Sequence, residues 1–211
     1  MDQYADCCMH KLAGEGTVEE MEKLLNEEWR GFVNYSCESH KWTPLNTAIS
    51  YGNVGMVELL LRYGANTTFS GGDSTALHEA AESRPYHGDM SAVTEIMALL
   101  TLKGLNVHQM DEHDRTPISI CCTKEAVDAL MKMGANLHGK HPYYGFTPLH
   151  WAILHRNSEV IKALIHHGAD LHALDSEGKT PLDMLLQHAY APHKQEEGDC
   201  GNEESCNSAD K

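Results

Sequence analysis

Apolar residues recur along the chain in two alternating phrases. The first phrase, TPLNTAIS, starts at Thr43, and related phrases start 32, 41, 31 and 33 residues further on, at Thr75, Thr116, Thr147 and Thr180. The second phrase follows as VELLLRYGAN, MALLTLKGLN, VDALMKMGAN and VIKALIHHGAD. Within it, Val57, Leu60 and Leu61 have the three- and four-residue spacing of a buried helical stripe. The pattern therefore predicts repeating pairs of helices.

Each phrase also carries the signals that begin or end a helix. A threonine can cap the first turn of a helix, and proline is tolerated directly after it. A glycine at the end of the second phrase can adopt the left-handed conformation that terminates a helix. The glycines in this position are Gly64, Gly104, Gly134 and Gly168.

These phrases and their period resemble the ankyrin repeat family, whose units of about 33 residues contain two antiparallel helices and a β-hairpin finger. The resemblance implies an all-α repeat solenoid of about five to six units with degenerate caps. We expect one domain over residues 1–191, with units near 1–39, 40–72, 73–113, 114–144, 145–177 and 178–191. Residues 1–39 lack the Thr-Pro start and are expected to form a helix-turn-helix cap with a polar outer face.

Two units depart from the common length. The third unit has extra residues between its helices, so Arg84 to Met90 are expected to form an exposed loop. The fourth unit lacks about three residues there, so its first helix is expected to be cut short. Cys121 and Cys122 are expected inside that apolar helix as reduced thiols, where free cysteine behaves as a small hydrophobe.

The chain is strongly acidic, with 16 Lys and Arg against 31 Asp and Glu and a formal net charge of -15. Such a charge disfavours nucleic acid and anionic membranes and favours a basic partner surface. Residues 192–211 are expected to be an acidic disordered tail, either merely solvating or a lure for a basic partner. The sequence shows no pattern of a secretory signal or of a membrane span, so we expect a cytoplasmic or nuclear monomer.

Histidines stand at two repeated positions. His78 and His150 occupy the fourth position of the first phrase, where the resemblance implies hydrogen bonds within and between hairpins; Asn46, Ser119 and Asp183 replace them elsewhere. The second position follows each helix-ending glycine by four residues, and its members His108, His138 and His172 are expected to stabilise the hairpins. Alternatively, the resemblance implies that they are substrates of an asparaginyl hydroxylase that also accepts histidine, with Leu100, Leu130 and Leu164 eight residues earlier.

The sequence offers no catalytic or metal-binding signature. It has no H-E-x-x-H, no phosphate-cradling G-x-x-x-x-G-K and no G-x-S-x-G. A zinc site could only come from His138 and His141, or from His166 and His167 with His172, and no cysteine stands at ligand spacing from any of these. We therefore expect no enzyme activity, no metal and no cofactor.

The resemblance implies a protein-interaction module, an adaptor or an inhibitor, that binds a protein partner on its concave face. An alternative is a structural array within a larger assembly. The groove positions, counted from each threonine, gather aromatics and an arginine, which are residue types enriched at interface hot spots. The expected partner-binding residues are His40, Trp42, Tyr51, Arg115, Tyr143, Tyr144, Phe146 and His155. Alternatively, Tyr143, Tyr144 and Phe146 only pack against the short fourth unit.

Overall fold

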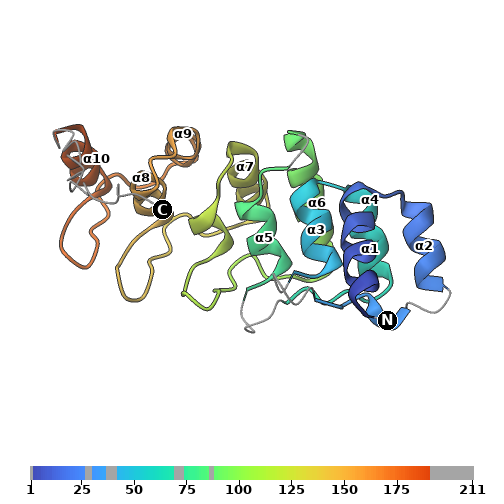
Figure 1. The fold of residues 1–211 in the computed structure, drawn as a ribbon. Helices are drawn as coiled ribbons and strands as arrows, with labels where there is room; N and C mark the ends of the chain where they lie inside the picture. The colour runs from blue at the N-terminus through green and yellow to red at the C-terminus, as the bar shows by residue number, and fades with distance from the viewer. Residues whose placement is uncertain (1, 27–29, 37–41, 69–73, 86–87, 191–211) are drawn as a thin grey trace, which may run out of the picture.

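In the computed structural model, helices stack side by side along one axis, from α1 and α2 at one end to α10 at the other (Figure 1). The structure describes residues 2–26, 30–36, 42–68, 74–85 and 88–190. The all-α repeat solenoid predicted from the sequence is confirmed. The helices follow in pairs, α1 (Asp2–Glu15) and α2 (Val18–Asn26), α3 (Pro44–Tyr51) and α4 (Val54–Arg62), α5 (Ala76–Glu82) and α6 (Met90–Leu102), the 3-10 helix η2 (Pro117–Ile120) and α7 (Lys124–Lys132), α8 (Pro148–Leu154) and α9 (Ser158–His166), and then α10 (Pro181–Tyr190).

The helix limits come from the predicted signals. Thr43 caps α3, because its hydroxyl accepts a hydrogen bond from the backbone N–H of Asn46 at 3.3 Å. Two of the second helices have an asparagine cap of their own, Asn53 for α4 and Asn157 for α9, whereas Asp89 caps α6 and Thr123 caps α7. The predicted left-handed glycines are confirmed, with φ of 85°, 91°, 84° and 90° at Gly64, Gly104, Gly134 and Gly168.

The core is a row of leucines repeated from pair to pair. One leucine of each second helix has no exposed surface, namely Leu25, Leu60, Leu100, Leu130 and Leu164. The first helices add Leu45, Leu77 and Leu149, which are also fully buried. Burying one such side chain stabilises the fold by about 1.5–3 kcal/mol. The repeated stripe therefore joins neighbouring pairs into one continuous core.

The connections between pairs are hairpin-shaped fingers closed by backbone hydrogen bonds. The N–H of Asp111 donates to the carbonyl of Arg115 at 2.9 Å, and the N–H of Asp175 to that of Lys179 at 2.9 Å. Within the described ranges, β-pairing is limited to one isolated bridge between Thr68 and Thr75. The fingers are thus tight turns rather than extended ladders.

The short fourth unit behaves as predicted in one respect and not in another. Its first helix is cut short, since only the four-residue 3-10 helix η2 forms. The placement of Cys121 and Cys122 inside a helix is wrong, because both residues follow the end of η2 and lie outside any helix. The missing residues leave too little chain for a second turn before Thr123 caps α7.

The long loop of the third unit is only partly exposed. Arg84, Gly88 and Asp89 are exposed as predicted, but Pro85 is buried. A Cβ placed on Gly52 would lie 3.0 Å from the Pro85 side chain, so the loop folds back onto the preceding pair. The expectation of an exposed loop from Arg84 to Met90 is therefore wrong at Pro85 and at Met90, which is half-buried and begins α6, while residues 86–87 lie outside the described residues.

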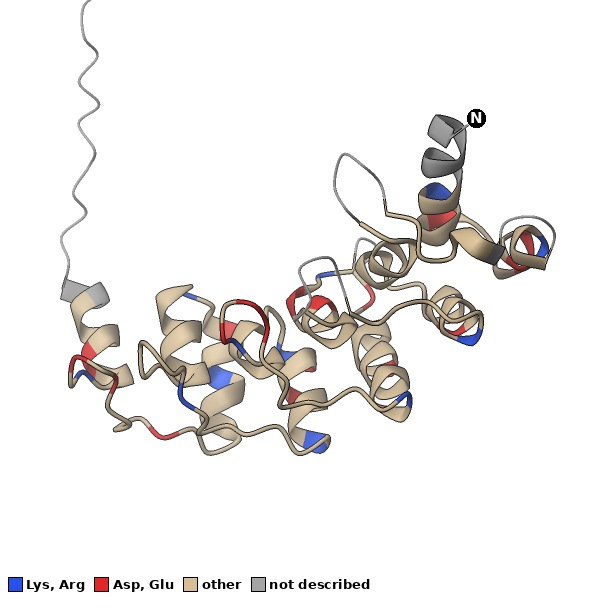
Figure 2. Cartoon of the chain, turned by 90° about the horizontal axis from the view of Figure 1, so that it is seen from below, with Lys and Arg blue, Asp and Glu red and all other residues tan. Residues whose placement is uncertain are grey.

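Charged residues are spread along the whole array. In Figure 2, Asp and Glu positions occur beside Lys and Arg positions, and no part of the described array carries charges of one sign only. No helix among the described residues is both long and apolar enough to span a membrane. The expected acidic tail, residues 192–211, and His40 lie outside the described residues. The unit boundaries stay a prediction.

Candidate protein-interaction surface

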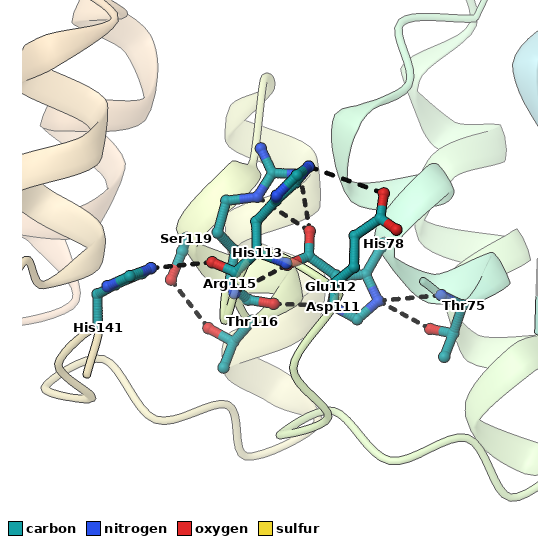
Figure 3. Close-up of polar contacts among 9 residues, drawn as sticks. All are labelled: Thr75, His78, Asp111, Glu112, His113, Arg115, Thr116, Ser119 and His141. Atoms are coloured by element: carbon teal, nitrogen blue, oxygen red, sulfur yellow. Dashed lines mark hydrogen bonds and ion pairs between the residues drawn. The ribbon is translucent and has the colours of Figure 1, made fainter. Parts of the chain in front are cut away.

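Buried histidines tie each finger to the helix beside it. His78 is 2% exposed. Its Nδ1 lies 3.3 Å from the Thr75 backbone nitrogen and 3.0 Å from the Thr75 hydroxyl, as in a capping box. Its Nε2 donates to the carbonyl of Arg115, in the next finger, at 3.0 Å (Figure 3). His150 repeats the arrangement with Thr147 at 3.1 and 2.8 Å and with the carbonyl of Lys179 at 3.4 Å. The predicted structural role of both histidines is confirmed.

These rings remain neutral more readily than a free imidazole. Burial lowers the pKa of His78 and of His150, against opposing hydrogen bonds to the carbonyls of Arg115 and Lys179. A neutral ring keeps a lone pair on Nδ1, which the capping threonine needs as an acceptor. The substitutes reproduce the contact within their own unit, since Asn46, Ser119 and Asp183 bond their own threonines at 2.7, 2.9 and 2.7 Å.

A further histidine, His141, organises the finger of residues 141–146, which we call the aromatic finger. Its Nδ1 accepts from the backbone N–H groups of Tyr143 and Tyr144 at 3.1 and 3.2 Å. Its Nε2 donates to the carbonyl of His113, in the preceding finger, at 2.9 Å (Figure 3). Sequence reasoning missed this role. A signal was present in the sequence, because His141 stands at nearly the same distance before a helix-starting threonine as two finger aspartates do. Asp111 and Asp175 stand five residues before their threonines, and His141 stands six before Thr147.

The aromatic finger is also fixed on its other side. The carbonyl of Tyr144 accepts from the backbone N–H of Ser176 at 3.0 Å. Gly145 has a φ of 67°, and a Cβ there would lie 2.7 Å from the nitrogen of Ser176. Only glycine allows this approach. The finger is therefore held between its two neighbours before any partner binds.

The rings around this finger form a cluster on the first helix of the same unit. Tyr143 and Tyr144 meet edge to face with centroids 5.0 Å apart, and Tyr144 and Phe146 lie 5.6 Å apart. Trp151 lies beneath them, 6.1 Å from Tyr144 and 5.2 Å from Phe146. Sequence reasoning missed Trp151, whose buried Nε1 has no hydrogen-bond partner within the described part of the chain.

Exposure separates the three predicted aromatics of the finger. Tyr143 is 77% exposed and Tyr144 is 45% exposed. Phe146 is half-buried against the core, and its ring stacks on His150 at 5.4 Å. Phe146 therefore packs, while the two tyrosines present most of their surface outward.

The structure does not gather every predicted site residue at this cluster. His155 is exposed and stacks on Trp151 at 6.1 Å, so it joins the cluster. Trp42 is 41% exposed, on the second unit. Tyr51 is half-buried, with its ring 3.1 Å from where a Cβ on Gly14 of α1 would stand.

Arg115 is engaged by its own finger. Its Nε and Nη2 donate to the buried Asp111 carboxylate at 2.9 and 2.7 Å (Figure 3). Burial opposes ionisation of Asp111, but hydrogen bonds from Arg115 and His113 outweigh it and lower the pKa of this carboxyl. Arg115 is therefore a fixed positive group and not a loose surface cation.

The second set of histidines acts differently from the prediction. The backbone N–H of His108, His138 and His172 donates to Asn106, Asn136 and Asp170 at 2.9, 3.0 and 2.8 Å. The stabilising side chain is thus the Asn or Asp two residues earlier, because an Asx turn needs its acceptor there. The three imidazoles are exposed. In the described part of the chain, no three His, Cys, Asp or Glu residues are grouped to hold a metal ion.

A row of helix pairs linked by finger histidines defines a helical repeat solenoid. The chain belongs to the ankyrin repeat family, whose model, described as ankyrin repeats in three copies, matches residues 9–90 and 77–175. Ankyrin repeats are generally protein-interaction modules. The described surface of this chain includes a finger that is held by its neighbours and carries two exposed tyrosines.

The chain is similar to parts of larger curated proteins. It is 32% identical over 151 residues to human palmitoyltransferase ZDHHC13, covering 69% of this chain and 23% of that protein. It is 27% identical over 198 residues to human ankyrin repeat and SOCS box protein 3, covering 89% and 36%. It is 34% identical over 95 residues to mouse ankyrin repeat and SOCS box protein 11, covering 44% and 29%. The chain thus spans well under half the length of these relatives.

Proposed function

We propose that this chain is a non-catalytic module that binds a protein partner on its concave face, with Tyr143 and Tyr144 as the central contacts. The observation that carries the proposal is the aromatic finger itself. Tyr143 is 77% exposed, yet its backbone is held by the buried His141. Tyrosines bury a large area at little conformational cost, which is why they are enriched at hot spots.

The fixed geometry of the finger favours binding. Ordering a rotamer-rich side chain at an interface costs about 0.5–1.5 kcal/mol. The edge-to-face contact of Tyr143 with Tyr144, at 5.0 Å, already restricts both rings in the free protein. His155 and Trp42 extend the proposed contact surface, and Arg115 belongs to it between the two aromatic groups, while Phe146 packs against the core. His40, which lies outside the described residues, and Tyr51 stay predicted contact residues.

The partner is proposed to present a basic surface overall. The net charge of -15 produces a field that attracts cations and increases the rate of association. An adaptor would hold this partner as a substrate, whereas an inhibitor would block it. Which of the two roles applies depends on what else the chain binds.

The proposal is tested by affinity purification with the full chain and two variants. In the first variant, Tyr143→Ala and Tyr144→Ala are combined. The matched control is Leu102→Ala, which removes an 83% exposed apolar side chain at the end of α6. We expect a partner that is retained by the control and lost by the tyrosine variant. A partner retained equally by both would place binding elsewhere.

A second candidate function is that of hydroxylase substrate, favoured by the exposure of His108, His138 and His172. A ring that faces solvent after a helix-ending glycine is reachable by an enzyme. Peptide mass spectrometry of the protein from its native cells would show the addition of one oxygen atom to a peptide containing one of these histidines. Unmodified peptides throughout would remove this candidate.

A further inference from the structure

The clipped fourth unit leaves a cavity in the array. Because η2 ends at Ile120, the far ends of α5 and α8 face each other across Cys121 and Cys122. The resulting cavity has a volume of about 480 Å³. Three consecutive units contribute to its walls, and burial raises the pKa of both Cys121 and Cys122, which favours the neutral thiols.

Arginines are concentrated in this cavity. The chain has only five, namely Arg30, Arg62, Arg84, Arg115 and Arg156. Three of them, Arg84, Arg115 and Arg156, line the cavity, one from each of the three units. These three guanidinium groups give the cavity a local positive charge, whereas the chain as a whole is negatively charged.

The nearby acidic groups leave part of this positive charge uncompensated. Arg115 is paired with Asp111 at 2.7 Å, and the lining Glu159 is paired with Lys162 at 3.0 Å. Arg84 donates at 3.2 Å to the carbonyl of Cys122, which carries no charge. Arg84 and Arg156 therefore face one lining carboxylate, Glu82, that has no ion pair of its own in the described part of the chain.

Arg156 stands where the backbone favours glycine. Its φ is 54°, in the left-handed region. The corresponding position in the second unit, nine residues after the helix-starting threonine, is Gly52 with a φ of 71°. Arginine is disfavoured in this conformation. Its exposed side chain has no partner among the described residues, so no internal contact accounts for its presence.

The remaining walls offer fixed hydrogen-bond donors. The first turn of α9 borders the cavity at Ser158 and Glu159, and its leading N–H groups have no partner inside the helix. Asn157 donates to the carbonyl of Cys122 at 2.8 Å, so the same oxygen holds side chains from two units. The cavity is thereby preorganised before binding.

We propose that this cavity binds an anionic group, a carboxylate or a phosphoryl group, at the end of a side chain of the partner. Guanidinium groups and helix N-termini recognise both anions by charge-assisted hydrogen bonds. Arg115 and His155 line the cavity and also belong to the predicted groove, so the cavity continues the surface of the aromatic finger. The identity of the ligand as part of a partner rests on the proposed function, whereas anion binding does not. One acidic anchor is compatible with a partner that is basic elsewhere.

The test titrates the full chain with small anions at constant ionic strength and follows backbone amide resonances by NMR. The probes are inorganic phosphate, N-acetyl-phosphoserine amide and N-acetyl-glutamate amide. We expect saturable shifts confined to the amides of residues 119–122 and 155–160. Tighter binding of the phosphoserine probe would assign a phosphoryl source, and tighter binding of the glutamate probe a carboxylate source.

The decisive variant is Arg156→Gly, which suits the left-handed backbone and therefore keeps the fold. It should weaken probe binding at least about tenfold, as expected for losing a charged hydrogen-bond donor. The matched control, Arg62→Gln, removes an arginine that pairs with Glu22 far from the cavity and should leave probe binding unchanged. Shifts that do not saturate, or equal affinity in Arg156→Gly, would overturn the proposal. Because Tyr143→Ala should spare probe binding, failure of the interaction surface and failure of this cavity are distinguishable.

Discussion

Replacing His150 by alanine should reveal how strongly a single ring joins two units. His150 has no exposed surface, caps α8 through Thr147 and reaches the carbonyl of Lys179 in the next finger. Losing a helix cap costs about 1 kcal/mol. Losing a buried ring that stacks on Phe146 costs about 2–4 kcal/mol more. We therefore expect His150→Ala to lower the free energy of unfolding by about 3–5 kcal/mol.

The matched variant is His150→Asn, because Asn46 already caps α3 with the same geometry, at 3.0 Å from the Thr43 nitrogen. Asparagine should keep the cap and lose the ring and the link to Lys179, so it should be less destabilising by about 1 kcal/mol. Urea denaturation followed by circular dichroism measures both. The reasoning fails if His150→Ala stays within about 1 kcal/mol of the parent, or if both variants lose the same stability.

Three further predictions follow from the same contacts. Burial lowers the pKa of His78 and His150 below the ordinary 6.5, so the stability that they supply should be complete above that pH and decline as pH falls through the lowered values; a melting temperature that is constant from neutral to mildly acidic pH would contradict this. Hydrogen exchange should be faster in residues 116–133 than in 147–168, because η2 replaces a full helix there; equal protection would refute it. Partner binding should weaken as salt rises, and deletion of residues 192–211 should slow association only if that segment attracts the partner; salt-independent affinity would exclude electrostatic steering.

Local signals explain why much of the fold could be predicted from the sequence. A threonine followed by proline, and a glycine after an apolar stripe, act within one turn of helix, so Thr43, Thr147, Gly64 and Gly168 predict the limits of their helices without knowledge of distant contacts. The hydrogen bonds of His78 could be predicted as well, since the family resemblance supplied the inter-finger partner that sequence alone leaves open.

Features that depend on spacing in three dimensions were not predictable in the same way. The sequence showed that the fourth unit is short. It did not show that the loss would replace an α-helix by η2 and leave Cys121 and Cys122 outside any helix. The role of His141 depends on the carbonyl of His113, 28 residues away. The cavity likewise depends on side chains from three units, which no local pattern brings together.

The central claim is that Tyr143 and Tyr144 bind a partner while Phe146 supports the fold, and one comparison tests it most directly. The affinity for the captured partner and the melting temperature are measured for the parent, for Tyr143→Ala with Tyr144→Ala, and for Phe146→Ala. We predict that the tyrosine variant loses at least about 2 kcal/mol of binding free energy at an almost unchanged melting temperature, and that Phe146→Ala lowers the melting temperature. Unchanged affinity of the tyrosine variant, or a loss of its stability as large as that of Phe146→Ala, would contradict the account.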